Sequence, residues 1–202
     1  MRHFPVRVAL HWLRLAVFLA GACGLVPGRL SWAVAAPVEM VVSRDAGLVD
    51  LRIRTTVEAP HAVIWSVLTD YGNTAKWVPG MESSVVLQRT GDGAVVEQSG
   101  FARVLFFQLA VHSVVRVREL PPDRIEVDLV KGDFKYLKGA YVIKALDATD
   151  GRYELVWHGR LELASQVPGF VAQPLLANNL RGSFEGLVGE VERRVKLVQP
   201  TK

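Results

Sequence analysis

The chain has 202 residues, half of them apolar, which favours a single folded domain with a sizeable core. Its formal net charge is +4, but four of the 24 basic residues and none of the 20 acidic ones fall within residues 1–35, so the remainder is electrically balanced. A balanced domain lacks the basic face that nucleic-acid binding requires, and we therefore exclude a nucleic-acid partner.

Residues 1–35 have the organisation of a secretory signal peptide. Three arginines among residues 2–14 precede an apolar run, residues 15–26, and the small residues 33–35 supply a cleavage site. We expect cleavage and a periplasmic or secreted protein. The alternative is an N-terminal membrane anchor, but the apolar run is shorter than the roughly 20 residues that a spanning helix needs. The only cysteine, Cys23, lies in this segment, so the mature chain has no disulfide; a lipid-anchored form through Cys23 also stays open.

The mature chain consists mainly of predicted β-strands. Residues 36–47 show no clear periodicity and are interpreted as a leader. Beyond them, alternating apolar and polar side chains, separated by turn residues, predict seven strands. These strands cover residues 49–57, 83–89, 94–102, 104–119, 125–129, 135–146 and 153–163. Between the first two strands, Pro60 begins a short helix that ends near residues 70–72, and a second helical turn covers residues 73–77.

The last long segment predicts an amphipathic helix from about residue 173 to 197, roughly 37 Å long. Its apolar stripe consists of Leu176, Leu180, Phe184, Leu187, Val191, Val195 and Val198. Pro174 is tolerated if it lies in the first turn, whereas a start at Pro168 would place it inside the helix and kink it. In either case we expect a gap between Val167 and Leu176 through which a ligand reaches the interior.

Three glycines lie close together on this helix, at positions 182, 186 and 189. Each costs about 1 kcal/mol relative to alanine in a helix, which indicates close approach of another backbone or of a bulky ligand. Asn178, Asn179 and Arg181, near the start of the helix, are candidates for the few polar groups at the mouth of a cavity.

The order of these elements predicts an α+β fold in which a curved antiparallel sheet surrounds the long C-terminal helix. This order and several short motifs resemble the START-like (SRPBCC) superfamily of polyketide cyclases/dehydrases and coenzyme Q-binding proteins. The motifs are Val57-Glu58-Ala59-Pro60, Leu68-Thr69-Asp70-Tyr71, Trp77-Val78-Pro79-Gly80, Gly132-Asp133-Phe134 with Leu137-Lys138-Gly139, and Pro168 with residues 187–194. The resemblance covers about residues 48–197. It implies the helix-grip fold and a hydrophobic cavity that binds a lipid, an isoprenoid quinone or a polyketide.

No motif indicates a catalytic or metal site. The histidines after residue 35 are His61, His112 and His158, and no spacing supplies any of them with an oriented catalytic partner. His112 is the one that could point into a cavity, but an ordinary packed or surface histidine is the favoured interpretation. The chain has no HExxH, CxxC or acidic cluster with metal-ligand spacing and no phosphate-binding loop, so we expect neither a metal nor a cofactor.

We expect the ligand-binding residues to be mainly aromatic and aliphatic, with core packing as the alternative for most of them. The candidates are Trp77, Phe101, Phe106, Tyr141, Trp157, Leu176, Asn179, Leu180 and Phe184. Three functions stay open: a carrier or sensor of a hydrophobic small molecule, an enzyme of the aromatase/cyclase type, and an interaction domain with a filled core. The missing acid–base constellation and the predicted export favour the first, with which transient membrane contact is compatible. No feature points to a protein partner.

Overall fold

The computed structural model describes residues 37–45, 47–104, 107–147, 151–164 and 169–198; the predicted signal segment, Cys23 and Phe106 lie outside these ranges. An eight-stranded antiparallel sheet has the strand order β1-β2-β8-β7-β6-β5-β4-β3. The strands are β1 (Glu39–Asp45), β2 (Leu48–Glu58), β3 (Met81–Thr90), β4 (Gly93–Val104), β5 (Phe107–Leu120), β6 (Arg124–Gly132), β7 (Phe134–Asp147) and β8 (Arg152–Leu163). The helices are α1 (His61–Leu68), the 3₁₀-helix η1 (Tyr71–Lys76) and α2 (Gly169–Val198).

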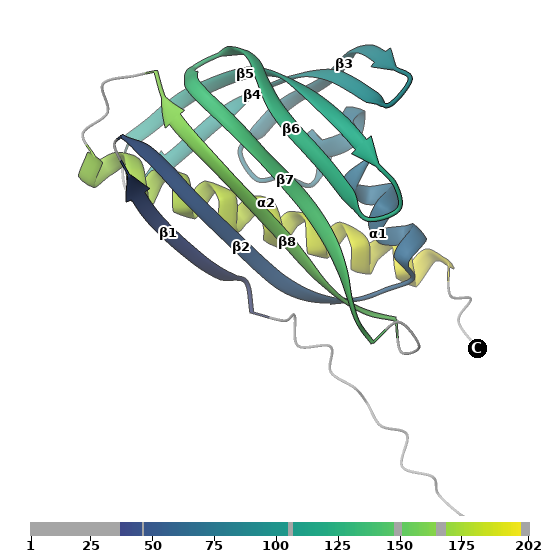
Figure 1. The fold of residues 1–202 in the computed structure, drawn as a ribbon. Coiled ribbons are helices and arrows are strands. Elements are labelled where there is room, and N and C mark those ends of the chain that lie inside the picture. Colours follow the sequence, from purple (N-terminus) through teal and green to yellow (C-terminus); the bar gives the residue numbers. More distant parts are fainter. Residues whose placement is uncertain (1–36, 46, 105–106, 148–150, 165–168, 199–202) are drawn as a thin grey trace, which may run out of the picture. The chain divides into compact units, whose positions relative to one another are not determined.

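The long helix α2 runs along one face of this sheet (Figure 1). It contacts β1 and β2 at one end of the strand order and β4 near the other end, and it also contacts α1. A single helix can touch strands so far apart in the order only because the sheet curves around it. The predicted helix-grip fold, with two short helices after the first long strand, is thereby confirmed.

The strand β1 was not predicted, and the interpretation of residues 36–47 as a leader is wrong. β1 pairs antiparallel with β2 over its whole length and adds a strand before the predicted domain start at residue 48. Met40 and Val42 pack against the core, whereas Val41 is 67% exposed. Because Val41 and Val42 are adjacent and both apolar, the two-residue alternation is hidden in the sequence.

The core of the described residues has two main parts. The larger part joins α1 and α2 to β2, β7 and β8, with Leu51, Ile53 and Leu155 among its fully buried side chains. The smaller part packs the ring of Tyr71 against β4, β5 and β6. Burial of this apolar area is the main force that holds the helices to the sheet.

The helix α2 begins at Gly169, so Pro174 lies inside it, as expected for the earlier of the two predicted starts. Leu175 and Leu176 are both buried, Leu175 in a cluster with Ala102 of β4. Val167 lies outside the described ranges, as do the side chains of residues 169–172, so the predicted gap stays a prediction. At the far end of the helix Val198 is 66% exposed, so the apolar stripe ends at Val195, which packs on the core. No helix in the part of the chain that the structure describes is long and apolar enough to cross a membrane.

Candidate functional site

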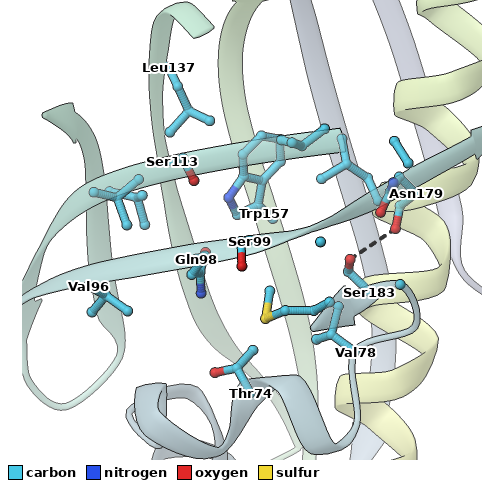
Figure 2. A pocket seen from close by; sticks show the side chains of 18 of the residues that line it. Thr74, Val78, Val96, Gln98, Ser99, Ser113, Leu137, Trp157, Asn179 and Ser183 are labelled. Carbon is cyan, nitrogen blue, oxygen red and sulfur yellow. Dashed lines mark hydrogen bonds between the residues drawn. The ribbon is translucent and has the colours of Figure 1, made fainter. Parts of the chain in front are cut away.

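A cavity of about 290 Å³ lies between α2, the curved sheet and the segment that joins η1 to β3 (Figure 2). Its size is near the lower end of the range typical for small-molecule sites. Its walls come from six strands (β3 through Met81 alone), the three helices and the connection after η1. They are residues 77–81, β4 (Val96 and 98–102), β5 (Val111, Ser113, Val115, Val117), β6 (Ile125, Val127), β7 (Phe134, Leu137, Tyr141), β8 (Trp157, Leu161, Leu163) and α2 (Leu175, Leu176, Asn179, Leu180, Ser183, Leu187), together with Leu68, Tyr71 and Thr74.

The strand β5 forms one wall because its side chains alternate between the two faces of the sheet. The four residues at odd positions from 111 to 117 all line the cavity. His112, between them, belongs to the other face: its Nε2 lies 3.0 Å from Oε1 of Glu97, and its side chain is 44% exposed. His112 is thus a surface histidine, in agreement with the favoured interpretation.

Seven of the nine predicted binding residues line the cavity: Trp77, Phe101, Tyr141, Trp157, Leu176, Asn179 and Leu180. Phe106 lies outside the described residues. Phe184 does not line the cavity. It is 1% exposed and stacks on the ring of Tyr141, with 6.0 Å between the ring centroids, so it packs in the core behind the cavity wall. Sequence reasoning missed Gln98 and Ser113 as polar lining residues, although Ser113 belongs to the alternating pattern of β5.

The floor of the cavity is formed by the indole of Trp157, which lies over two glycines. Gly139 of β7 and Gly159 of β8 are directly paired. A Cβ atom at Gly139 would lie 2.9 Å from Cζ2 of Trp157, and one at Gly159 would lie 2.4 Å from Cη2. The two missing side chains therefore provide the space for the indole ring. Tyr141 lies beside Trp157, at 6.5 Å between ring centroids, and burial raises the pKa of its hydroxyl to about 12.

The rim of the cavity is the connection from Trp77 to Gly80, which is held between β4 and α2. Phe101 donates a backbone hydrogen bond of 2.7 Å to the carbonyl of Gly80, and the positive φ of Gly80, 79°, suits glycine. On the other side, a Cβ atom at Gly186 would lie only 2.1 Å from the backbone oxygen of Trp77. The expected close approach of another backbone is therefore found at Gly186. It is not found at Gly189, where a Cβ atom would have nothing within 4 Å. Nε1 of Trp77 is buried and has no hydrogen-bond partner among the described residues.

Of the three polar residues predicted for the cavity mouth, only Asn179 lines the cavity. Asn178 is exposed, and Arg181 donates a hydrogen bond of 2.9 Å to the carbonyl of Val38. This hydrogen bond of Arg181 links α2 to the chain just before β1. Arg181 does not face a ligand.

A group of ion pairs ties η1 to α2 on the outer side of Trp77. Arg194 bridges the carboxylates of Asp70 and Glu190, at 2.5 and 2.7 Å, and Arg193 binds Glu190 through two nitrogens at 2.7 Å each. Glu190 is only 7% exposed. The hydrogen bonds from Arg193, and those from Arg194 after them, lower the pKa of Glu190 to about 2 against the opposing effect of burial. We call Asp70, Glu190, Arg193 and Arg194 the rim ion pairs.

We expect Glu190 to make the stability of the domain depend on acid pH. Because its pKa falls from about 4.5 to about 2 on folding, its stabilising effect is complete above pH 4.5 and is lost as the pH falls towards 2. Glu190→Gln should lower the free energy of unfolding at pH 7 by on the order of 2 kcal/mol, since much of Arg193 is exposed to solvent. Urea unfolding at pH 7, 4 and 2.5 measures this.

The matched control for this prediction is Glu185→Gln, which changes an exposed carboxylate of the same helix. It should unfold like the wild type at each pH. An identical pH dependence of stability in Glu190→Gln and the wild type would contradict the role assigned to Glu190.

The chemistry of the cavity follows from what its walls contain. Among the described residues that line it there is no aspartate, glutamate, histidine, lysine or arginine. The polar side chains are those of Thr74, Gln98, Ser99, Ser113, Asn179 and Ser183, besides the two tyrosines and two tryptophans. The hydroxyl of Tyr71 donates to Glu119 at 3.1 Å and is therefore engaged elsewhere. Within the described ranges no three metal-ligating side chains lie together either. Such a cavity can enclose an apolar molecule and offer it a few neutral hydrogen bonds.

Comparisons with known proteins agree with this geometry. A family model described as polyketide cyclase / dehydrase and lipid transport matches residues 57–183. The Zhui aromatase/cyclase from Streptomyces sp. R1128 is 19% identical, with a TM-score of 0.64 over 73% of this chain and 96% of that chain. The protein TTHA0849 from Thermus thermophilus is 18% identical, with a TM-score of 0.61 over 72% and 98% of the two chains.

A START superfamily protein from Mycobacterium smegmatis is 21% identical, with a TM-score of 0.60 over 71% of this chain and 97% of that chain. At these identities the likeness concerns the fold. No curated protein matches the chain significantly.

Proposed function

Because the chain belongs to the polyketide cyclase / dehydrase and lipid transport family, as its motifs indicate, we propose that it is an exported, non-catalytic carrier or sensor of a hydrophobic small molecule. The ligand occupies the cavity between α2 and the sheet. The observation that carries this proposal is the composition of the wall, which is mostly aliphatic and aromatic and holds no charged side chain among the described residues.

The proposed ligand class is that of lipids, isoprenoid quinones and polyketides. The aromatic floor and rim, formed by Trp157, Tyr141 and Trp77, suit a flat ring or an unsaturated chain. The signal-like segment at residues 1–35 supports export to the periplasm or beyond.

The competing function is an aromatase/cyclase reaction, as named for the Zhui protein. Such a reaction needs a group that accepts a proton and a group that donates one. Tyr141 has the only tyrosine hydroxyl among the described residues that is available to the cavity, and its pKa of about 12 keeps it protonated at neutral pH. With no carboxylate or histidine beside it in the wall, binding without turnover is the better supported function.

The proposal is tested on the full chain, expressed with its N-terminal segment and purified from the exported fraction. Native mass spectrometry and solvent extraction should find a co-purifying hydrophobic molecule, and the protein mass should correspond to loss of about the first 35 residues. A ligand-free protein that also fails to bind the neutral dye Nile red would overturn the binding function. A protein of full-length mass that stays in the membrane fraction would contradict the exported, soluble form.

A further inference from the structure

The wall of the cavity contains a hydroxyl that has no hydrogen-bond partner among the described residues. Ser113 of β5 is 8% exposed and lines the cavity, and its hydroxyl makes no hydrogen bond within the described part of the chain. Figure 2 shows this side chain on the wall of the cavity opposite α2. Among the described residues only Nε1 of Trp77 is a fully buried side-chain polar atom without a partner, so the Ser113 oxygen is accessible from the cavity and is free to hydrogen-bond to a molecule bound there.

An amide lies next to this hydroxyl. Ser113 is paired directly with Gln98 of β4, and both side chains line the cavity. Directly opposed residues have Cβ atoms about 5 Å apart, so the hydroxyl and the amide can bind the same atom group. The amide nitrogen of Gln98 has only a long contact, 3.4 Å, to the hydroxyl of Ser84, and the amide oxygen has no partner among the described residues.

The neighbouring cross-strand pairs are apolar. Val96 is paired with Val115 on one side, and Gly100 is paired with Val111 on the other. Ser113 and Gln98, which we call the polar pair, therefore form a hydrogen-bonding point between two apolar cross-strand pairs, with Ser99 of β4 as a further polar lining residue next to Gln98. Such a point fixes the orientation of a ligand while the surrounding wall supplies contact area.

The charge of the ligand is restricted by the same wall. No cationic or anionic side chain lines the cavity among the described residues, so a carboxylate, phosphate or ammonium group would be buried there without an opposite charge. A carbonyl or hydroxyl oxygen meets no such penalty, because the amide of Gln98 and the hydroxyl of Ser113 can both donate to it.

We propose that the polar pair is the recognition point for a neutral oxygen group of the ligand, a ring carbonyl or a hydroxyl, and that the cavity selects such molecules over both plain hydrocarbons and ionised acids. This inference rests on the proposed binding function and adds the chemical class of the ligand. It assigns Ser113 as the residue that determines specificity and Gln98 as its partner.

The test compares three probes of similar size: 2-methylnaphthalene, 2-methyl-1,4-naphthoquinone and 2-naphthoate. Each displaces Nile red from the wild type, from Ser113→Ala and from Ser83→Ala, a control serine on β3 that does not line the cavity. In the wild type the quinone should bind about tenfold more tightly than the hydrocarbon, and the naphthoate should bind most weakly. Ser113→Ala should weaken the quinone about five- to tenfold and leave the hydrocarbon within about twofold. Ser83→Ala should behave as wild type.

The outcomes separate this inference from the proposed function. If Ser113→Ala binds the quinone as tightly as the wild type does, or if the naphthoate competes as well as the quinone, the polar pair does not select the ligand, although the cavity still binds. If neither Nile red nor any probe binds the folded wild type, the binding function itself fails. Circular dichroism and thermal unfolding establish that the variants are folded. Gln98→Met removes the amide of the polar pair and so tests the same inference through its other member.

Discussion

Filling the cavity from the sheet side should abolish ligand binding while the protein stays folded. Val115 lines the cavity and is paired with Val96, which faces the same space. We expect Val115→Phe to weaken Nile red and ligand binding roughly tenfold, and Val96→Phe/Val115→Phe to weaken it by more than about 100-fold, because each added ring occupies volume that the ligand needs. Dye titration and native mass spectrometry measure the loss.

The control for cavity filling is Arg116→Phe, the next residue along β5, which is exposed on the opposite face. It adds the same ring to the same strand and should leave binding unchanged. Overpacking typically costs about 1–3 kcal/mol, so thermal unfolding has to show that the filled variants remain native at the temperature of the titration. Undiminished binding by a folded double variant would place the ligand elsewhere on the protein.

The largest change in stability is expected for Gly186→Ala. The added methyl group would lie 2.1 Å from the backbone oxygen of Trp77, a distance that no rotation of a side chain can relieve. Either α2 or the rim connection has to move. We expect a loss of about 3 kcal/mol in the free energy of unfolding, even though alanine is the better helix former. Because Trp77 lines the cavity, ligand binding should weaken as well. Urea unfolding and dye titration give the two readouts.

Gly189→Ala is the matched control, one turn further along the same helix. Nothing lies within 4 Å of the position of its added methyl group. Here the helix propensity of alanine acts alone, and we expect a gain of up to about 1 kcal/mol. The two substitutions should therefore have opposite signs. If both stabilise the protein, the contact between α2 and the backbone of Trp77 is not as close as described.

These two glycines show what the sequence could predict and what it could not. Their helical spacing indicated a close approach on that face of α2, and this holds at Gly186. Which glycine makes the contact depends on where the connection after η1 lies, and that position is fixed by pairing between Gly80 and Phe101, far along the chain. Periodicity within one helix carries no information about such a partner.

A similar limit explains why one of the predicted binding residues does not line the cavity. The apolar stripe of α2 identified the buried face, but a stripe does not distinguish a side chain that meets empty space from one that meets another side chain. Leu180 lines the cavity, whereas Phe184, one turn later, meets Tyr141 and stacks on it. The polar pair was missed because its two members lie on different strands and become neighbours only through the β4–β5 register.

The strands themselves were largely predicted, because alternation over long runs such as 153–163 is a strong signal of a half-buried strand. The exception, β1, is short, and its two adjacent valines hide the pattern. β1 is held in the sheet by its pairing with β2 and by an ion pair between Glu39 and Arg54. Both are tertiary interactions, which the local sequence pattern does not reveal.

The glycines under Trp157 have a consequence for the volume of the cavity. Since Gly139 and Gly159 lack side chains, the indole of Trp157 can occupy the space over these two residues. A methyl group at either position would collide with the ring and displace it, which would change the volume of the cavity. The volume open to the proposed ligand is thus set in part by two residues that do not line the cavity themselves.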